Sequence, residues 1–441
     1  MSYAEAIQFL YGLRLFGAKF GLENTFKLAA LASNPQERLR FIHVAGTNGK
    51  GSTCAMLESI YRAAGLRVGL FTSPHLVSFR ERIQVNRQLV SEADVVRLVE
   101  QLRPWFKTFP TDHHPTFFEV VTVMALNFFA EQKCDLAVWE TGLGGRLDAT
   151  NIVTPLASVI TNVQFDHQQW LGDTLEKIAA EKAGIIKPGV PVITADEEPA
   201  VLAVIERTAR DNQAPFIVVA VDVNPPQTTK ISAALSRAAA TLPLPGDHQR
   251  INAALALATV EVLQNKIPVG DEAIRTGLSE VNWPGRLQLV TRPSGQQILL
   301  DGAHNLAGVA ALRKTLENEF PAAKRTLVLG VLQDKDWRRM CEILAPLAAR
   351  IVAVRVSSER TADANELATA CRGANASAEV IAVDSMAEAL EKSAEDEFVV
   401  VAGSLYLVGE ALELLGLAPA GKSERALNEW QAASPPAPVR R

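Results

Sequence analysis

The chain has 441 residues, of which 48% are hydrophobic and 21% are charged, and its formal net charge at pH 7 is -5. This composition is typical of globular proteins and argues against a fibrous or disordered chain. The length exceeds what one ordinary hydrophobic core organises, so we expect two domains. The acidic balance offers no excess of cations to a nucleic-acid backbone or an anionic membrane, and we expect neither as a partner.

The N-terminus and the apolar runs indicate a cytoplasmic protein. Residues 1–15 include Glu5 and lack the basic start, long apolar core and cleavage site of a secretory signal. The longest apolar runs, such as 216–221 and 398–402, have the length of strands and are too short to span a bilayer. The cysteines are far apart and form no C-x-x-C pair, so we expect reduced core thiols at Cys54, Cys134, Cys341 and Cys371.

Taken in chain order, the first part of the sequence alternates short apolar runs with polar or glycine-rich loops and helical patterns, which is typical of a parallel sheet. The predicted strands are 40–45, 67–72, 135–140, 156–161 and 191–194, and the predicted helices are 53–64, 117–131 and 252–263. Residues 281–286 contain Trp283, Pro284 and Gly285, which interrupt regular structure, so we place a domain boundary just after them. A second series of strands is predicted at 297–300, 326–330, 350–354 and 398–402.

This order predicts an α/β protein with two domains. Residues 1–290 are expected to form a P-loop-type domain with a parallel sheet flanked by helices, and residues 296–420 a smaller, Rossmann-like α/β domain. Residues 421–441 lack a strand pattern, and we expect a flexible tail without chemistry. Ligands of such sheets bind beyond the carboxyl ends of the strands, so the polar signatures after the strands should converge on one crevice in each domain.

The segment HVAGTNGKGS, residues 43–52, predicts a nucleotide-binding loop. A strand ends near Gly46 and a helix begins near Ser52, so backbone N–H groups can bind phosphate while Lys50 supplies positive charge. The segment departs from G-x-x-x-x-G-K-[ST], because Val44 stands at the first glycine and Gly51 separates the lysine from the hydroxyl. A plain glycine-rich turn is the alternative, and the lysine among small and polar residues favours phosphate binding.

Glu140 and His167 are candidates for a metal site, because they follow two predicted strands at the edge of the sheet that carries this loop. Mg²⁺ prefers oxygen ligands, which suits Glu140 better than His167. From the pattern alone, His167 is equally well explained as a loop histidine hydrogen-bonded to Asp166. Ser73 alone indicates only a turn residue before Pro74.

Nine segments between about Phe20 and Leu407 carry a specific pattern. They are HVAGTNGKGS, FTSPHLVSFRERI, TFFEVVTVMAL, ETGLGGRLDATN, DHQQWLGDTLEKIAAEKAGIIK, WPGRLQLV, LDGAHN, GVLQDKDW and VAGSLYL. Together they resemble the folylpolyglutamate synthase and dihydrofolate synthase family of the Mur ligase superfamily. The resemblance implies an ATP- and Mg²⁺-dependent ligase that joins L-glutamate to dihydropteroate and to the glutamate tail of reduced folates, through an acyl phosphate.

The resemblance also implies roles for single residues. For ATP, as co-substrate, it implies Asn48, Gly49, Lys50, Gly51, Ser52, Asn252, Arg286 and Asp301. For Mg²⁺, of which two ions are expected, it implies Ser73, Glu140, His167 and a carbamylated Lys182. The catalytic residues that it implies are Lys50, Lys182 and His304. For the pterin or folate it implies Phe20, Gly21, Leu22, Thr116, Phe117, Phe118, Glu119, Leu147, Asp148 and Ala149.

These residues also have plain structural explanations. Phe117 and Phe118 are explained equally by the core of a helix, Arg286 by a linker cap and Asp301 by a turn. Without the resemblance, Lys182 indicates a lysine on a helix surface, paired with Glu181 or Glu176. Residues 334–336 predict a solvated charged loop outside the site.

Three other functions compete with the bifunctional ligase. A folylpolyglutamate synthase without dihydrofolate synthase activity has the same motifs. A Mur-type ligase that adds amino acids to a cell-wall precursor shares the phosphate loop, but ETGLGGRLDATN argues against it. A non-catalytic nucleotide-binding protein is disfavoured, because the sequence retains Lys50, Ser73, Glu140, His167 and Lys182. We expect the ligase to act as a monomer.

Overall fold

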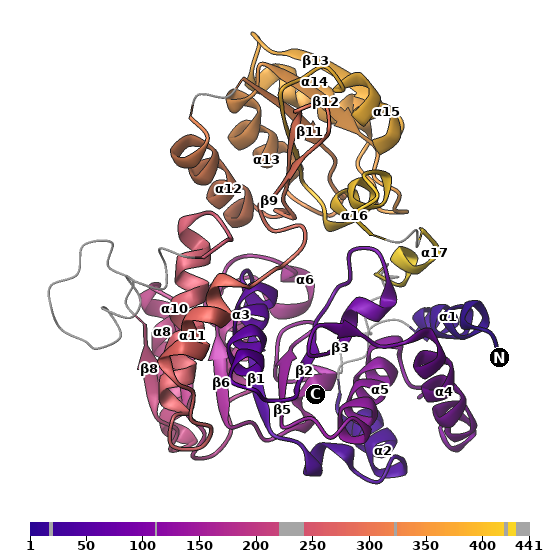
Figure 1. Cartoon of the computed structure of the whole chain (residues 1–441), viewed down its shortest axis with the longest axis vertical. Helices are drawn as coiled ribbons and strands as arrows, with labels where there is room; N and C mark the ends of the chain where they lie inside the picture. Colours follow the sequence, from indigo (N-terminus) through magenta and orange to yellow (C-terminus); the bar gives the residue numbers. More distant parts are fainter. Residues whose placement is uncertain (17–20, 111–112, 220–241, 322–323, 419–421, 429–441) are drawn as a thin grey trace, which may run out of the picture.

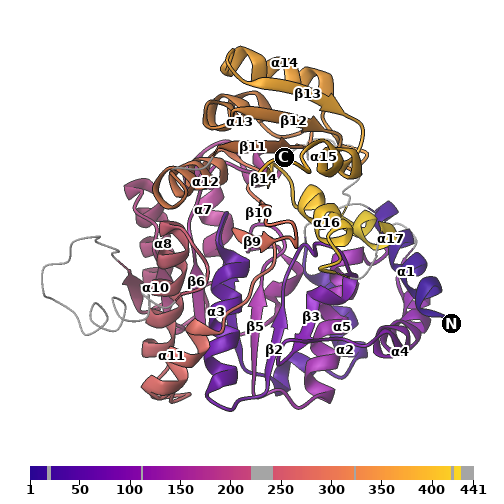
Figure 2. The same ribbon diagram turned by 45° about the horizontal axis from the view of Figure 1, so that its top comes forward.

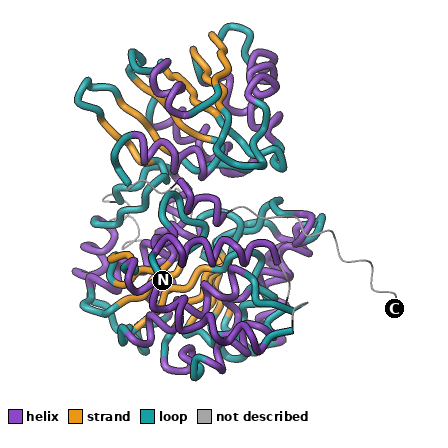
Figure 3. The backbone as a smooth tube through the Cα atoms, turned by 90° about the vertical axis from the view of Figure 1, so that its right-hand side faces the viewer, coloured by secondary structure: helices purple, strands orange, loops and turns teal. Residues whose placement is uncertain are grey.

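The computed structural model describes residues 1–16, 21–110, 113–219, 242–321, 324–418 and 422–428. Two lobes stand one above the other, each built around its own sheet (Figure 1). The tube view shows strands at the centre of both lobes, with helices around them (Figure 3). The predicted α/β fold with two domains is confirmed.

The first sheet has eight strands in the order β4-β3-β2-β5-β1-β6-β7-β8. The strands are β1 (Phe41–Ala45), β2 (Val68–Phe71), β3 (Ile83–Val85), β4 (Gln88–Leu89), β5 (Leu136–Glu140), β6 (Ala157–Ile160), β7 (Val192–Thr194) and β8 (Phe216–Val218). Seven of them point in the same direction, and β3 runs antiparallel to both of its neighbours, β2 and β4. The sheet is therefore mixed where a parallel one was predicted. Asn86 and Arg87 have positive φ angles of 48° and 66° and form the tight two-residue turn of this edge hairpin.

Helices cover both faces of the first sheet (Figure 2). Its central strands are therefore buried along their whole length. One face packs against α3 (Lys50–Ala63), α10 (Asp247–Val262) and α11 (Asp271–Ser279). The other face packs against α1 (Tyr3–Gly12), α2 (Glu23–Leu31), α4 (Glu92–Leu102), α5 (Phe117–Glu131), α7 (Leu175–Ala183) and α8 (Pro199–Asp211). The short helix α6 (Gln168–Leu171) precedes α7. Alternate residues of β1 point to opposite faces, as strand geometry requires.

The second sheet has six strands in the order β13-β12-β11-β14-β10-β9. They are β9 (Gln288–Thr291), β10 (Gln297–Leu300), β11 (Arg325–Leu329), β12 (Arg350–Val354), β13 (Glu379–Val383) and β14 (Phe398–Ala402). One face packs against α12 (Leu306–Glu319), α13 (Trp337–Leu344) and α14 (Ala364–Ala374), and the other against α15 (Met386–Lys392) and α16 (Leu405–Leu414). Strand β9 pairs antiparallel with β10, so the predicted division at residue 290 falls inside a strand of the second sheet.

Short 3₁₀ turns complete the described chain. They are η1 (Leu13–Phe16), η2 (Pro35–Arg38), η3 (Phe79–Arg82), η4 (Arg103–Thr108), η5 (Ala149–Ile152), η6 (Ala345–Leu347) and η7 (Ala426–Asn428). All four cysteines are buried and have free thiols, as predicted. Within the described ranges, no helix is both long and apolar enough to cross a bilayer.

The start of the predicted flexible tail is folded, which corrects that prediction. Helix α17 (Lys422–Arg425) and η7 lie beside α1 of the first domain (Figures 1 and 2). Leu427 is 2% exposed and belongs to the core under α5. Burial of this leucine gives the segment a reason to dock that its polar and alanine-rich composition did not indicate. Residues 429–441 lie outside the described residues.

Candidate active site

A cavity of about 770 Å³ lies between the two sheets and is lined by loops of both domains. These loops follow the carboxyl ends of parallel strands, where α/β proteins bind their ligands. The loops of both domains meet at this one shared cavity. All the residues predicted for ATP, for the metal and for catalysis line it. Of the residues predicted for the pterin, Leu22 packs against the core and is not part of the lining, and Phe20 lies outside the described residues.

The phosphate loop connects β1 to α3, and its shape depends on two close approaches. A Cβ on Gly46 would lie 1.8 Å from the Thr161 hydroxyl oxygen. Gly49 has a φ of +82°, and a Cβ there would lie 2.3 Å from Oδ1 of Asn252. Larger residues are therefore excluded, because Cβ atoms never come this close to other groups and left-handed backbone favours glycine.

Lys50 begins α3 and folds back over the loop. Its Nζ atom donates hydrogen bonds to the carbonyl oxygens of Gly46, at 3.0 Å, and Thr47, at 3.1 Å. The backbone N–H of Asn48 donates to Oδ1 of Asn162 at 2.9 Å, which anchors the loop to the end of β6. An ammonium group and a helix N-terminus thus meet at the cavity, which is the arrangement that binds phosphate.

Glu140 ends β5 beside Ser73, which follows β2. The Ser73 N–H donates to Oε2 of Glu140 at 3.0 Å, and the Ser73 hydroxyl is buried with no hydrogen-bond partner. Burial raises the pKa of Glu140 to about 7, although Lys50 opposes the shift. A bound cation would stabilise both the buried carboxylate of Glu140 and the unpaired hydroxyl of Ser73.

These groups fit Mg²⁺ as a partial set of protein ligands. Among the described residues, no three His, Cys, Asp or Glu side chains gather as a metal cluster. The oxygens of Ser73 and Glu140, with His167 in the same cavity, are an incomplete set of ligands. Mg²⁺ usually keeps several waters and takes substrate phosphate oxygens, so a partial protein set beside a phosphate loop suits this ion.

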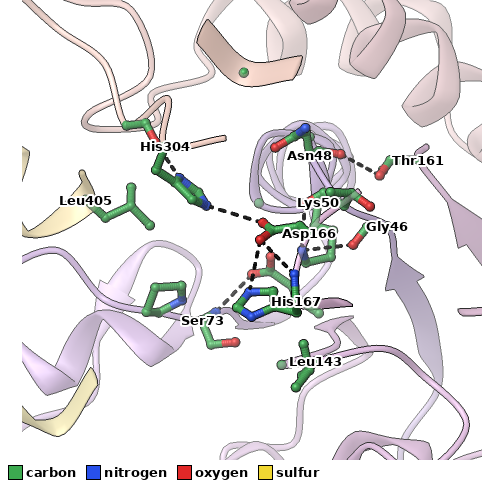
Figure 4. Close-up of a pocket in the computed structure, with 18 of the residues that line it drawn as sticks. Gly46, Asn48, Lys50, Ser73, Leu143, Thr161, Asp166, His167, His304 and Leu405 are labelled. Carbon is green, nitrogen blue, oxygen red and sulfur yellow. Dashed lines mark hydrogen bonds and ion pairs between the residues drawn. The ribbon is translucent and has the colours of Figure 1, made fainter. Parts of the chain in front are cut away.

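Asp166 is the centre of a polar cluster that joins the two domains (Figure 4). From the second domain, it receives Lys335 Nζ at 2.7 Å and Asn305 Nδ2 at 3.2 Å, and His304 Nε2 lies 3.9 Å away. From its own loop, the N–H of His167 donates to Oδ1 at 2.9 Å. Burial opposes ionisation of Asp166, yet the positively charged neighbours hold its pKa below the usual range.

Lys335 corrects a prediction, because residues 334–336 were expected to be a solvated loop outside the site. Its side chain is only 10% exposed, and its charge is paired with Asp166. Asn305 also donates to Oδ1 of Asn48 in the phosphate loop at 3.0 Å. Lys335 and Asn305 belong to the motifs GVLQDKD and LDGAHN, which follow strands of the second domain. Their contacts are with residues of the first domain, far away in the sequence, so no local pattern could indicate them.

Lys182 lies in α7 and reaches under the phosphate loop. Its side chain is 3% exposed and its Nζ donates to the Gly46 carbonyl at 2.8 Å. Burial, with the nearby charge of Lys50, lowers the pKa of Lys182 to about 7. The alternative of a surface lysine is therefore wrong, and Glu181 instead pairs with Arg146 at 2.8 Å.

The hinge and the second domain contribute Arg286, Asp301 and His304. Asp301 accepts from the N–H groups of Leu287 and Ala303, both at 2.9 Å, so it also stabilises the turn that the sequence allowed. Burial lowers the pKa of His304 to about 4, and its Nδ1 lies 2.7 Å from the Gly302 carbonyl. The carbonyl accepts from Nδ1–H, which leaves Nε2 of the neutral ring unprotonated.

The N-terminus of α5 and the turn after β5 form the wall predicted for the pterin. Thr116 and Glu119 form a reciprocal capping box at the start of α5. The Phe118 ring lies against Gly142, where a Cβ would approach it to 2.5 Å. Asp148 accepts from the Leu143 N–H at 2.7 Å and so holds the turn. Thr116, Glu119 and Asp148 thus have structural roles and also line the cavity.

Comparison with known proteins identifies the families that the two domains match. Residues 44–260 match the Mur ligase middle domain, and residues 285–405 match the Mur ligase glutamate ligase domain. The dihydrofolate synthase/folylpolyglutamate synthase of Bacillus subtilis (strain 168) is 38% identical over 423 residues, which cover 93% of this chain and 98% of that protein. The crystal structure of the folylpolyglutamate synthase from Thermotoga maritima matches with a TM-score of 0.83 and 35% identity, covering 96% of this chain and 99% of the other.

A second solved structure is the Escherichia coli FolC in complex with DHPP and ADP. It matches with a TM-score of 0.81 and 31% identity, covering 95% of this chain and 98% of the other. The two matched domains, with a phosphate loop facing the glutamate ligase domain, define a Mur-type, ATP-dependent ligase. Within that class, the chain belongs to the dihydrofolate synthase/folylpolyglutamate synthase family. The family predicted from the motifs is confirmed.

Proposed function

We propose that this protein uses ATP to join the amino group of L-glutamate to the carboxyl group of dihydropteroate, and also to the glutamate tail of reduced folates. One observation carries the proposal. The same cavity of about 770 Å³ is lined by the phosphate loop and by the aromatic and apolar side chains of Phe117, Phe118 and Leu147. A flat pterin and a nucleotide triphosphate can therefore be held within reach of each other.

The proposed reaction has two steps. The acceptor carboxylate takes the γ-phosphoryl group of ATP, which gives an acyl phosphate and ADP. The glutamate amine then attacks the acyl carbon, an amide bond forms, and inorganic phosphate leaves. Phosphoryl transfer depends mainly on positioning and charge neutralisation, and Lys50, at the loop, supplies positive charge for it.

In this proposal, Ser73, Glu140 and His167 hold Mg²⁺. When bound, the ion neutralises phosphate charge and orients the γ-phosphoryl group. The unpaired Ser73 hydroxyl and the buried Glu140 carboxyl support the assignment. Glu140 has to be ionised for this role, and a neighbouring cation lowers the pKa of a carboxyl group.

Lys182 is proposed to carry a carbamate. The neutral amine attacks carbon dioxide, a nitrogen–carbon bond forms, and one proton leaves to solvent. Two features support this: the lowered pKa of about 7 makes neutral amine available near neutral pH, and the new anion would lie near the positive charge of Lys50. Its two oxygens could serve a second Mg²⁺.

His304 is proposed to accept the proton that the glutamate amine loses as the amide forms. Its Nδ1–H is engaged by Gly302, its free Nε2 faces the cluster around Asp166, and the ring lines the cavity. A neutral imidazole with one free nitrogen is the form that a general base requires.

The proposal is tested by incubating purified protein with ATP, Mg²⁺, L-glutamate and either dihydropteroate or tetrahydrofolate. ADP release that depends on both glutamate and acceptor is expected with each acceptor. Release with tetrahydrofolate alone would reduce the function to polyglutamylation. No glutamate-dependent release with either acceptor would refute the proposed ligase.

A further inference from the structure

The folded end of the chain returns from the second domain to the first. After α16, residues 422–428 dock beside α1 and the loop that follows β2 (Figure 2). Glu424 accepts hydrogen bonds from the Phe79 N–H at 2.7 Å and from the Ser78 hydroxyl at 2.8 Å. Leu427 and Asn428 line the cavity. The C-terminal segment is thus part of the site's wall, although the sequence assigned it no role.

Arg82, at the end of η3, also lines this wall and is only 3% exposed. Its Nε donates to Nδ1 of His75 at 2.8 Å, and its Nη2 donates to Oδ1 of Asn428 at 2.5 Å. The guanidinium carbon lies 5.3 Å from the centre of the Phe117 ring. Within the described part of the chain, no carboxylate forms an ion pair with Arg82. The carboxylates of Glu81 and Glu140 act on Arg82 only through space, and its hydrogen bonds go to neutral groups. Such a buried guanidinium is costly unless an anion joins it.

Arg82 is oriented by Asn428, which belongs to the C-terminal segment, and by His75, which this segment keeps in place through a hydrogen bond. Asn428 presents Oδ1 to Arg82 and donates from Nδ2 to the His75 carbonyl at 2.9 Å. The carbonyl oxygen of Glu424 lies 2.8 Å from Nε2 of His75, so this nitrogen carries the proton and Nδ1 is free to accept from Arg82. Two contacts from one segment therefore fix the direction of the guanidinium.

We propose that Arg82 binds the carboxylate of dihydropteroate, and that Asn428 of the C-terminal segment is the positioning residue that aims it; this inference rests on the proposed function. A guanidinium matches a carboxylate with two parallel hydrogen bonds, so its orientation decides the strength of the contact. Phe117, against which Arg82 lies, belongs to the wall proposed for the pterin. The Arg82 guanidinium thus lies where the aminobenzoate part of dihydropteroate would extend from the pterin ring.

The test measures the binding of two ligands to the full chain. One is 7,8-dihydropteroate, and the other is 6-hydroxymethyl-7,8-dihydropterin, which has the same pterin ring but lacks the p-aminobenzoate group that carries the carboxylate. In Asn428→Ala we expect the dissociation constant of dihydropteroate to rise about tenfold and that of the carboxylate-free pterin to change by less than about twofold. Arg82→Lys, which keeps the charge and loses the fork, should show the same selective loss.

A matched control is Asn375→Ala. The Asn375 amide donates to the carbonyls of Ala345 and Ala348 and does not line the cavity. We expect this variant to lower the melting temperature and leave both dissociation constants unchanged. Should Asn428→Ala fail to fold, Asn428→Ser gives the same comparison with a smaller loss of polarity.

The outcomes separate the inference from the proposed function. Equal weakening of both ligands in Asn428→Ala, or no weakening of either, would overturn the positioning role. Selective weakening in Arg82→Lys but not in Asn428→Ala would overturn the part assigned to the C-terminal segment. If the unaltered protein binds dihydropteroate but does not ligate it, the proposed function is wrong. The role of Arg82 and Asn428 is then still decided by the dissociation constants of the variants.

Discussion

The Nζ atom of Lys335 lies 2.7 Å from Oδ1 of Asp166, and this ion pair connects the two domains at the cavity. Both side chains are at most 10% exposed, so the charges are poorly screened by solvent. His304 and Asn305 approach the same carboxylate from the second domain. The pair is thus one of the contacts that join the glutamate ligase domain to the side of the cavity that carries the phosphate loop.

Lys335→Ala is expected to lower kcat about tenfold or more, because it leaves Asp166 buried without its cation and weakens domain closure. Steady-state kinetics with dihydropteroate measure this. The matched control is Lys314→Ala, since Lys314 also crosses between the domains, to Asp247, but is 63% exposed. Its exposed pair contributes little, so kcat should stay within about twofold of the unaltered value. Similar losses in both variants would contradict the role given to Lys335.

Lys50→Ala is expected to abolish ligation, with kcat lowered by at least about a thousandfold, because the phosphates lose their positive charge in the loop. The fold should remain, since within the described residues the hydrogen bonds of the Lys50 ammonium go to the carbonyls of Gly46 and Thr47 in its own loop. Initial rates of ADP release and a thermal melt provide the two readouts. Turnover near that of the unaltered protein would sink the assignment of the phosphate loop.

Glu140→Gln is expected to raise the Mg²⁺ concentration needed for half-maximal activity by about tenfold, because an amide keeps the size of the side chain and loses the charge. A magnesium titration at saturating ATP measures it. Glu176→Gln is a suitable control, since Glu176 is exposed in the first turn of α7. An unchanged titration in Glu140→Gln would remove this residue from the metal site.

Lys182→Ala is expected to be nearly inactive and to recover part of its activity when a small carboxylic acid replaces the lost anion. The unaltered protein, treated with acid and then neutralised, should need bicarbonate to regain activity. Incorporation of ¹³C-bicarbonate, followed by NMR, checks the carbamate independently of turnover. Full activity of Lys182→Ala without added acid would show that the buried amine has no part in the reaction.

The sequence predicted well what depends on neighbouring residues. Strand β14 and helix α5 have the predicted bounds, because each is a long apolar run with clear ends. The loop proposed to bind phosphate lies between a strand and a helix as predicted, because its glycines and lysine stand together in the chain. The hairpin of β3 and β4 was missed, since strands of three and two residues are too short to show an alternating pattern.

Contacts between distant residues could not be predicted. Lys335 and Asp166 are 169 positions apart, and Arg82 and Asn428 are 346 positions apart. No local period connects such pairs, and a charged loop or an alanine-rich tail has the same composition whether it docks or not. The resemblance supplied the residues that are proposed to bind phosphate and metal. Only the folded chain supplied the side chains that connect the two domains.

The most direct test of the proposed ligation follows the oxygen atoms of the acceptor. Dihydropteroate labelled with ¹⁸O in its carboxyl group is incubated with the protein, ATP, Mg²⁺ and L-glutamate, and the products are analysed by mass spectrometry. Activation as an acyl phosphate predicts dihydrofolate together with inorganic phosphate that carries one ¹⁸O atom. Unlabelled phosphate, or the absence of dihydrofolate, would contradict the account.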